Sequence, residues 1–192
     1  MSESRRPSLA RPTIAIALIT AATAVALWWL GRRWWCACGE SWLVTAEAYD
    51  RHTSQHLLDP YSVTHVLHGI GFWWIVWPFA RQRSDAWRGI AVMLLEAAWE
   101  VLENTPAIIA RYRTETAALG YEGDTIVNAL ADSACCGVGA WLAAWTGFRW
   151  SLVVFIAAEL LLAWWIRDNL TLNIQMLLWP LESVRVWQAG HG

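Results

Sequence analysis

The sequence predicts an all-α protein, a polytopic bundle of transmembrane helices that forms one membrane domain over residues 1–192. Two observations predict this class. First, 57% of the residues are hydrophobic and only 16% are charged, whereas a soluble domain carries roughly 25% charged residues. Second, five apolar runs approach the ~20 residues that a helix needs to cross a bilayer. Backbone groups find no water in hydrocarbon, so each run is expected to be helical.

The predicted spans cover residues 12–30, 61–80, 89–110, 125–147 and 151–166. The first run ends in Trp28-Trp29 and is followed by Arg32-Arg33, without a small-residue cleavage site. We therefore expect it to remain as a span rather than to be removed as a signal peptide. The tail over 167–192 is apolar but interrupted by Pro180, which favours a C-terminal interfacial helix over a re-entrant segment.

Arginines near the span ends predict the orientation. They gather in the N-terminal tail and in the short loop after the second run, at Arg5, Arg6, Arg11, Arg81, Arg83 and Arg88. The positive-inside rule then places the N-terminus in the cytoplasm and the C-terminus outside. The chain has no lysine and a net charge of -2, which excludes a basic surface for nucleic acid.

Ionisable residues inside the runs are the main functional signal. The second run carries His65 and His68, the third carries Glu96, Glu100 and Glu103, and the fourth carries Asn128 and Asp132 just after Asp124. Three- and four-residue spacings place each set on one helix face. A charged residue at the centre of a span costs roughly 2.5–3.5 kcal/mol on insertion scales, so such residues usually face a bundle interior.

The three polar faces are predicted to meet at one depth. At a rise of about 1.5 Å per residue, His68, Glu103 and Asp132 each lie roughly 10 Å below the same membrane surface. On that side, His56 and Asp59 precede the second run. The residues can therefore share one pocket that opens toward the outer face.

Carboxylates in one pocket repel each other unless they share a cation or protons. The interpretation that we favour is a divalent metal, Zn, Mn or Fe, because mixed imidazole and carboxylate ligands suit these ions. The candidate ligands are His65, His68, Glu103 and Asp132, with His56 and Asp59 nearby. A proton or ion relay and a purely structural hydrogen-bond network are the alternatives.

The leading functional hypothesis is a metal-dependent hydrolase or transferase acting on an envelope lipid or lipid-linked substrate. Glu100 or Asp124 would be the general base on an activated water. Arg111, Arg113 or Arg167 would bind a phosphate or carboxylate group, with Asn128 as a further substrate contact. The alternatives are a non-enzymatic membrane subunit whose tryptophan faces meet a membrane-protein partner, and a proton or metal-ion conduit.

The cysteines allow a second interpretation of the loop after the first run. Cys36-x-Cys38 precedes His52-x3-His56, which resembles a zinc spacing of two cysteines and two histidines, one residue short between the cysteines. A structural zinc, a redox-active or metal-capturing thiol pair, and inert or disulfide-paired cysteines all stay open. Cys135 and Cys136 lie among small residues in the fourth run and fit helix packing.

Several motifs together resemble one family of small inner-membrane proteins of alphaproteobacterial type that is uncharacterised. They are Cys36-Ala37-Cys38-Gly39, Ser54-Gln55-His56-Leu57, His65-Val66-Leu67-His68-Gly69, Trp99-Glu100, Glu103-Asn104, Arg111-Tyr112-Arg113, Gly123-Asp124 and Arg167-Asp168-Asn169. The resemblance covers residues 12–190 and implies a multi-pass protein of the bacterial inner membrane, without an activity. The order of Asp59, His65, Glu100, Asp124 and Asp132 is more remotely similar to VanZ-like membrane proteins. His52 departs from the family pattern.

Overall fold

The computed structural model describes residues 10–116, 118 and 120–190. These residues form seven α-helices and one 3-10 helix, which confirms the all-α prediction. The predicted cytoplasmic residues Arg5 and Arg6 lie outside the described residues. The helices are α1 (Ala10–Trp29), α2 (Ser62–Val76), η1 (Trp77–Phe79), α3 (Asp85–Glu103), α4 (Pro106–Glu115), α5 (Ile126–Ile166), α6 (Leu170–Leu178) and α7 (Glu182–Ala189).

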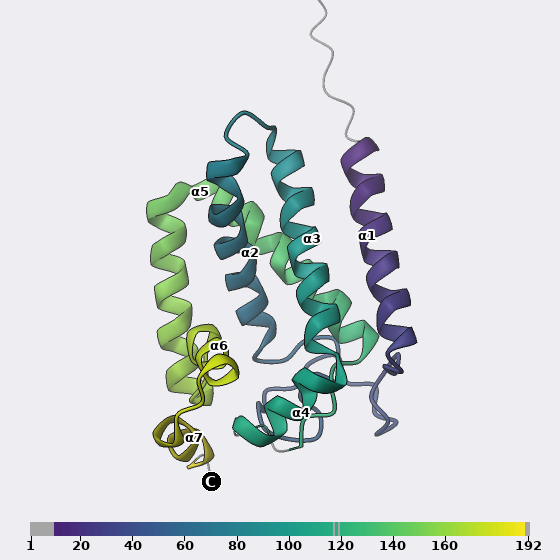
Figure 1. The fold of residues 1–192 in the computed structure, drawn as a ribbon, viewed down its shortest axis with the longest axis vertical. Helices are drawn as coiled ribbons and strands as arrows, with labels where there is room; N and C mark the ends of the chain where they lie inside the picture. The colour runs from purple at the N-terminus through teal and green to yellow at the C-terminus, as the bar shows by residue number, and fades with distance from the viewer. Residues whose placement is uncertain (1–9, 117, 119, 191–192) are drawn as a thin grey trace, which may run out of the picture.

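The long helices form a bundle with most of the irregular structure at one end (Figure 1). Helix α2 packs against α5 and α3, and α1 packs against α3 and α5. Helix α5 turns back on itself at Gly147, whose φ of 75° is a conformation that favours glycine. The loop between α1 and α2, together with α4, α6 and α7, lies at the end of the bundle away from this turn.

The chain over 89–110 is two helices rather than one. Helix α3 ends at Glu103, and α4 begins at Pro106 after Thr105, whose hydroxyl accepts a hydrogen bond from the Ile108 backbone N–H. Proline lacks a backbone N–H and disfavours a helical conformation in the residue before it. Pro106 therefore ends α3 and lets α4 leave the bundle axis, with Asn104 buried at the corner.

Within the part of the chain that the structure describes, two helices are long and apolar enough to cross a membrane, namely α1 over Arg11–Trp29 and α5 over Ile126–Ile166. Helix α2 has 15 residues, and α3 has carboxylates along one face, which lowers its hydropathy. Large apolar side chains cover the outside of both long helices, including Leu18, Trp29, Leu160 and Trp164. Such an outer surface is expected where lipid replaces water.

Helices α2 and α5 meet at two glycines. A Cβ on Gly69 would lie 1.9 Å from the Cys136 carbonyl oxygen, and one on Gly139 would lie 1.9 Å from the Val66 carbonyl oxygen. Small residues at a helix crossing let the two backbones approach closely. This contact fixes α2 against α5, so it sets the position of the histidines of α2 relative to the acids of α5.

The glycine contact predicts the effect of adding one methyl group on α2. Gly69→Ala should lower the free energy of unfolding by about 3 kcal/mol, because the new methyl overlaps backbone atoms that cannot move independently. Gly71→Ala is the matched control, since nothing lies within 4 Å of its new Cβ; it should leave stability unchanged or raise it slightly. Thermal unfolding in detergent measures both, and equal melting temperatures would contradict the proposed packing.

Candidate metal centre

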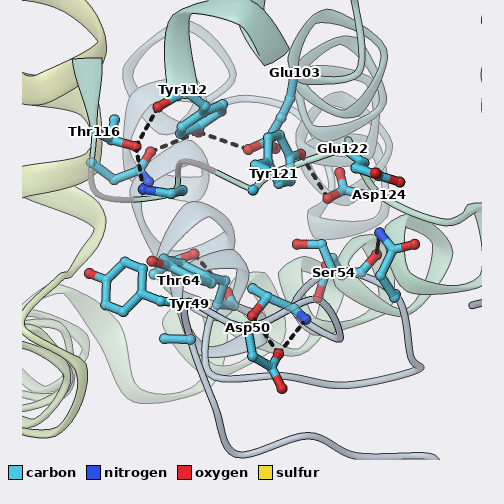
Figure 2. A pocket seen from close by; sticks show the side chains of 18 of the residues that line it. Tyr49, Asp50, Ser54, Thr64, Glu103, Tyr112, Thr116, Tyr121, Glu122 and Asp124 are labelled. Carbon is cyan, nitrogen blue, oxygen red and sulfur yellow. Dashed lines mark hydrogen bonds between the residues drawn. The ribbon is translucent and has the colours of Figure 1, made fainter. Parts of the chain in front are cut away.

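A cavity of about 400 Å³ lies at the loop-rich end of the bundle and is rich in acidic side chains (Figure 2). Helices α2, α3, α4 and α5 contribute to its wall, and the loop between α1 and α2 closes one side. The ionisable residues in its lining include His65, His68, Glu103, Asp124, Asp132 and Asp168.

One buried carboxylate orients both histidines of α2. His65 Nδ1 lies 2.6 Å from Glu96 Oε1, and His68 Nδ1 lies 3.1 Å from Glu96 Oε2. An ionised carboxylate only accepts hydrogen bonds, so each Nδ1 carries the donated hydrogen, and in the neutral imidazole each Nε2 can then bind a cation. A carboxylate behind an imidazole is the usual arrangement for a metal-binding histidine, because it fixes both tautomer and ring orientation.

Next to these histidines, three buried side chains have polar atoms without a hydrogen-bond partner among the described residues. They are both carboxylate oxygens of Glu100, Oδ1 of Asp132, and both amide atoms of Asn128. One ligand atom each from His65, Glu100 and Asp132 lie within 4.8 Å of one another. A buried carboxylate without a partner costs several kcal/mol, and a cation between these three residues would remove that cost.

A second group of carboxylates shares Glu100. Ligand oxygens of Glu100, Glu103 and Asp124 also lie within 4.8 Å of one another. Asp124 Oδ1 accepts a hydrogen bond from the Tyr121 hydroxyl (2.8 Å), and Glu103 Oε1 accepts one from the Tyr112 hydroxyl (2.8 Å), as Figure 2 shows. Because Glu100 belongs to both groups, it is placed to bridge two cations.

The two tyrosines remain hydrogen-bond donors. Burial raises the pKa of Tyr112 and of Tyr121 well above the ordinary value, and the charge of Glu103 or Asp124 raises it further. Asn104 Nδ2 donates to Asp124 Oδ2 (2.7 Å). These donors fix Glu103 and Asp124, whereas Glu100 accepts no hydrogen bond from the described residues and has His65 Nδ1 3.3 Å from its Oε1.

The structure brings His65, His68, Glu100, Glu103, Asp124 and Asp132 together and places the other two candidate ligands elsewhere. His56 belongs to a separate cluster with the loop cysteines. Asp59 accepts hydrogen bonds from the backbone N–H groups of Ser54 (2.6 Å), Tyr61 (2.7 Å) and Ser62 (3.2 Å). Both of its oxygens are thus engaged, and its role here is to cap the start of α2.

The arginines expected to bind substrate contact backbone carbonyl groups. Arg111 donates to Leu177 and Leu178, Arg113 to Tyr121, and Arg167 to Trp187. These bonds tie α4 to α6 and α5 to α7. The arginines that line the cavity are instead Arg33 and Arg51, both from the loop between α1 and α2.

Two kinds of residue at this site were not predicted. Glu96 was placed on the polar stripe of the third run but not in the site, although its spacing of four residues from Glu100 puts both on one face. Tyr112, Tyr121 and Asn104 gave no signal in residue spacing. They come from α4 and the loop before α5, and their approach to the carboxylates depends on the corner at Pro106.

Asp168 makes the stability of this end of the molecule depend on pH. Its carboxylate accepts hydrogen bonds from the Tyr61 hydroxyl (3.0 Å) and Gln188 Nε2 (3.0 Å). Burial nevertheless raises the pKa of Asp168 from 3.8 to about 6. The folded carboxyl therefore holds its proton more tightly than the unfolded one, and the ionised form destabilises the fold at neutral pH.

We predict that Asp168→Asn removes part of the pH dependence of stability. Relative to this variant, the wild-type protein should gain about 2 kcal/mol of unfolding free energy as the pH falls from 7 to 4, because the folded carboxyl takes up its proton near pH 6 and the unfolded one near pH 3.8. Asp85→Asn, at an exposed carboxylate, is the control and should follow the wild type. Parallel pH profiles for wild type and Asp168→Asn would contradict the assignment.

Comparison with known proteins gives the family. Residues 27–190 match a family described as "Protein of unknown function (DUF2585)". A UPF0314 protein of Paracoccus denitrificans is 42% identical over 179 residues, 93% of each chain. One from Agrobacterium fabrum is 40% identical over 188 residues, 98% of this chain and 94% of that one. One from Novosphingobium aromaticivorans is 41% identical over 175 residues, 88% of each chain.

No solved structure matches the chain. The likeness to VanZ-like membrane proteins stays a prediction. The expected uncharacterised family of alphaproteobacterial proteins is confirmed, and the chain belongs to the DUF2585 family, whose relatives carry the name UPF0314 protein.

Proposed function

We propose that this chain is a bacterial inner-membrane enzyme, a metal-dependent hydrolase or transferase that acts on an envelope lipid or a lipid-linked substrate. The observation that carries the proposal is the convergence of His65, Glu103, Asp124 and Asp132 on one cavity, with Glu100 buried beside them. Both oxygens of Glu100 and Oδ1 of Asp132 have no hydrogen-bond partner among the described residues. Such a constellation attracts divalent cations.

Exposed aromatic residues at the two ends of the helix bundle support the membrane location. Trp28, Trp29 and Trp164 are exposed at helix ends near the cavity. Phe79, Trp145 and Trp150 are exposed near the turns at the opposite end of the bundle. Tryptophans concentrate at both interfaces of a bilayer, so this arrangement supports five crossings by α1, α2, α3 and the two limbs of α5, with the cavity at headgroup depth.

The candidate ligands form two groups that share Glu100. His65, Glu100 and Asp132 would hold one cation, and Glu100 and Glu103 would hold a second one of the same class, Zn, Mn or Fe, with Asp124 next to it. A divalent ion supplies the positive charge that lowers the pKa of a water molecule and stabilises a developing oxyanion. His68 lines the cavity, and its Nδ1, like that of His65, is hydrogen-bonded to Glu96. This arrangement makes His68 a further ligand for a cation or for the substrate.

Asp124 is the group that we assign as general base. It lines the cavity, and hydrogen bonds from Tyr121 and Asn104 hold its carboxylate in place. A fixed carboxylate next to the cation can take the proton of a water molecule that enters the cavity. Arg33 and Arg51 line the same cavity and would bind a phosphate group of the substrate.

The effect of Glu100→Gln on the free energy of unfolding should depend on whether metal is bound. Without metal, Glu100→Gln should be more stable than the wild type, because it removes a buried charge that has no hydrogen-bond partner and that lies among other carboxylates. With Mn²⁺ at about 100 times its dissociation constant, the wild type should gain about 2.7 kcal/mol, and the variant should gain much less. Glu47→Gln, at an exposed loop position, should respond to Mn²⁺ like the wild type.

Melting temperatures in detergent, with metal content from mass spectrometry, decide this comparison. A wild-type protein that binds no metal after chelator-free purification and is not stabilised by Mn²⁺ or Zn²⁺ would refute the metal centre. The carboxylate cluster would then be a structural network.

The activity itself is tested on vesicles that contain phosphatidylglycerol, phosphatidylethanolamine and a polyprenyl diphosphate. Lipid mass spectrometry should detect turnover of one of these lipids by the metal-loaded protein. Turnover should fall at least about 100-fold in Asp124→Asn, because this substitution removes the general base. No turnover by metal-loaded protein would overturn the enzymatic proposal while leaving the metal centre intact.

A further inference from the structure

A second cluster of metal-ligand atoms lies in the loop between α1 and α2. One ligand atom each from Cys36, Cys38, His52 and His56 lie within 4.8 Å of one another. Cys36 Sγ is 3.9 Å from His52 Nδ1, Cys38 Sγ is 4.0 Å from His56 Nε2, and these two ring nitrogens are 3.2 Å apart. All four residues come from the loop, and none belongs to the carboxylate cluster.

The separations that involve the histidine nitrogens are close to those of a tetrahedral zinc site. With zinc bonds of about 2.3 Å to sulfur and 2.0–2.1 Å to nitrogen, tetrahedral ligands lie about 3.6 Å apart for sulfur to nitrogen and about 3.3 Å apart for two nitrogens. Two imidazole nitrogens that face each other at 3.2 Å either share one proton or bind a common cation. The presence of two sulfur atoms beside them favours the cation.

Hydrogen bonds from the surrounding backbone orient the ligand atoms of this cluster. His56 is fully buried, and its Nδ1 lies 2.7 Å from the Trp42 carbonyl oxygen. A carbonyl oxygen only accepts, so Nδ1 carries the hydrogen and Nε2 points to the cluster free to bind. The backbone N–H groups of Cys38 and Glu40 donate to Cys36 Sγ (3.3 Å) and Cys38 Sγ (3.4 Å), and in the reduced form these bonds would stabilise negative charge on sulfur.

His52 is held in place by its own turn. Asp50 Oδ1 accepts hydrogen bonds from the backbone N–H groups of His52 (2.8 Å) and Thr53 (3.0 Å), and the Trp42 ring packs against the imidazole with 5.3 Å between centroids. Arg51 Nε donates to His52 Nε2 (3.2 Å). When Nδ1 binds a metal, Nε2 must carry the hydrogen, so the exposed Arg51 side chain has to move away.

We propose that Cys36, Cys38, His52 and His56 form a zinc site whose occupation depends on the redox state of the two cysteines. The structure joins Cys36 and Cys38 in a disulfide, a form in which the sulfurs are not thiolate ligands. Reduction by a dithiol, which becomes a disulfide itself, transfers two electrons and two protons and opens the S–S bond. The two thiols release those protons as Zn²⁺ binds.

The zinc site would fix the loop that closes the cavity. Cys36 and Cys38 line the cavity together with Arg33 and Arg51, the two arginines assigned to the substrate. The same loop contacts the start of α5, where Gln55 Nε2 donates to the Gly123 carbonyl oxygen (2.8 Å). Zinc binding would free Arg51 from His52, and disulfide formation would release the metal and let Arg51 donate to His52 Nε2 again, as it does in this structure.

Cobalt tests the site without reference to activity. Full-length wild-type protein in detergent is reduced under anaerobic conditions and titrated with Co²⁺ as a substitute for Zn²⁺. Thiolate ligation gives a sulfur-to-cobalt charge-transfer band in the near ultraviolet, which carboxylate and imidazole ligands do not give. We expect this band to saturate at one Co²⁺ per chain and to disappear when a disulfide-forming oxidant or an excess of Zn²⁺ is added.

Matched variants separate this site from the carboxylate cluster. Cys36→Ser/Cys38→Ser should abolish the band, Cys135→Ala/Cys136→Ala should retain it, and Glu100→Gln should retain it whether or not the proposed enzymatic centre exists. No band in the fully reduced wild type, or a band that survives Cys36→Ser/Cys38→Ser, would overturn the proposal.

A measurement on the unaltered protein avoids variants that fail to fold. Zn²⁺ should slow alkylation of Cys36 and Cys38 by iodoacetamide at least tenfold, followed by peptide mass spectrometry, and a chelator should restore the fast rate. Equal alkylation rates with and without Zn²⁺ would refute the site.

Discussion

The carboxylate of Glu100 is buried without a hydrogen-bond partner among the described residues, and this constraint explains much of the surrounding structure. Its neighbours include Glu103, Asp124 and Asp132, whose charges raise the free energy of any state in which all are ionised. His65 alone cannot balance four carboxylates. Either protons or cations must be bound, and imidazole nitrogens beside clustered carboxylate oxygens are a ligand set that suits Zn, Mn or Fe.

The scaffold holds these groups at one level through a few backbone features. The glycine contact between α2 and α5 sets the distance from His65 to Asp132, whose Nε2 and Oδ2 atoms are 3.9 Å apart. The corner at Pro106 brings Tyr112 of α4 back over the end of α3, where it reaches Glu103. The turn at Gly147 returns α5 so that Asp168, just beyond its end, also lines the cavity.

The sequence predicted those site residues whose positions follow from helical spacing. The stripes of α2, α3 and α5 could be predicted because residues three or four apart share a face, and matching depths bring His68, Glu103 and Asp132 to one cavity. Spacing says nothing about loops. It therefore could not predict that Asp59 binds backbone N–H groups or that His56 lies with the cysteines. It also could not predict that Arg33 and Arg51, rather than Arg111 and Arg113, line the cavity. Each of these positions depends on how irregular segments fold over the helix ends.

An anomalous difference map would show whether a cation lies among the carboxylates. Crystals of the full-length protein grown with Zn²⁺ would be measured on both sides of the zinc absorption edge. We expect a peak bounded by His65, Glu100 and Asp132, separate from any peak at Cys36 and Cys38. A map without a peak there, in which Glu100 and Asp132 instead form direct hydrogen bonds to other protein groups, would contradict it.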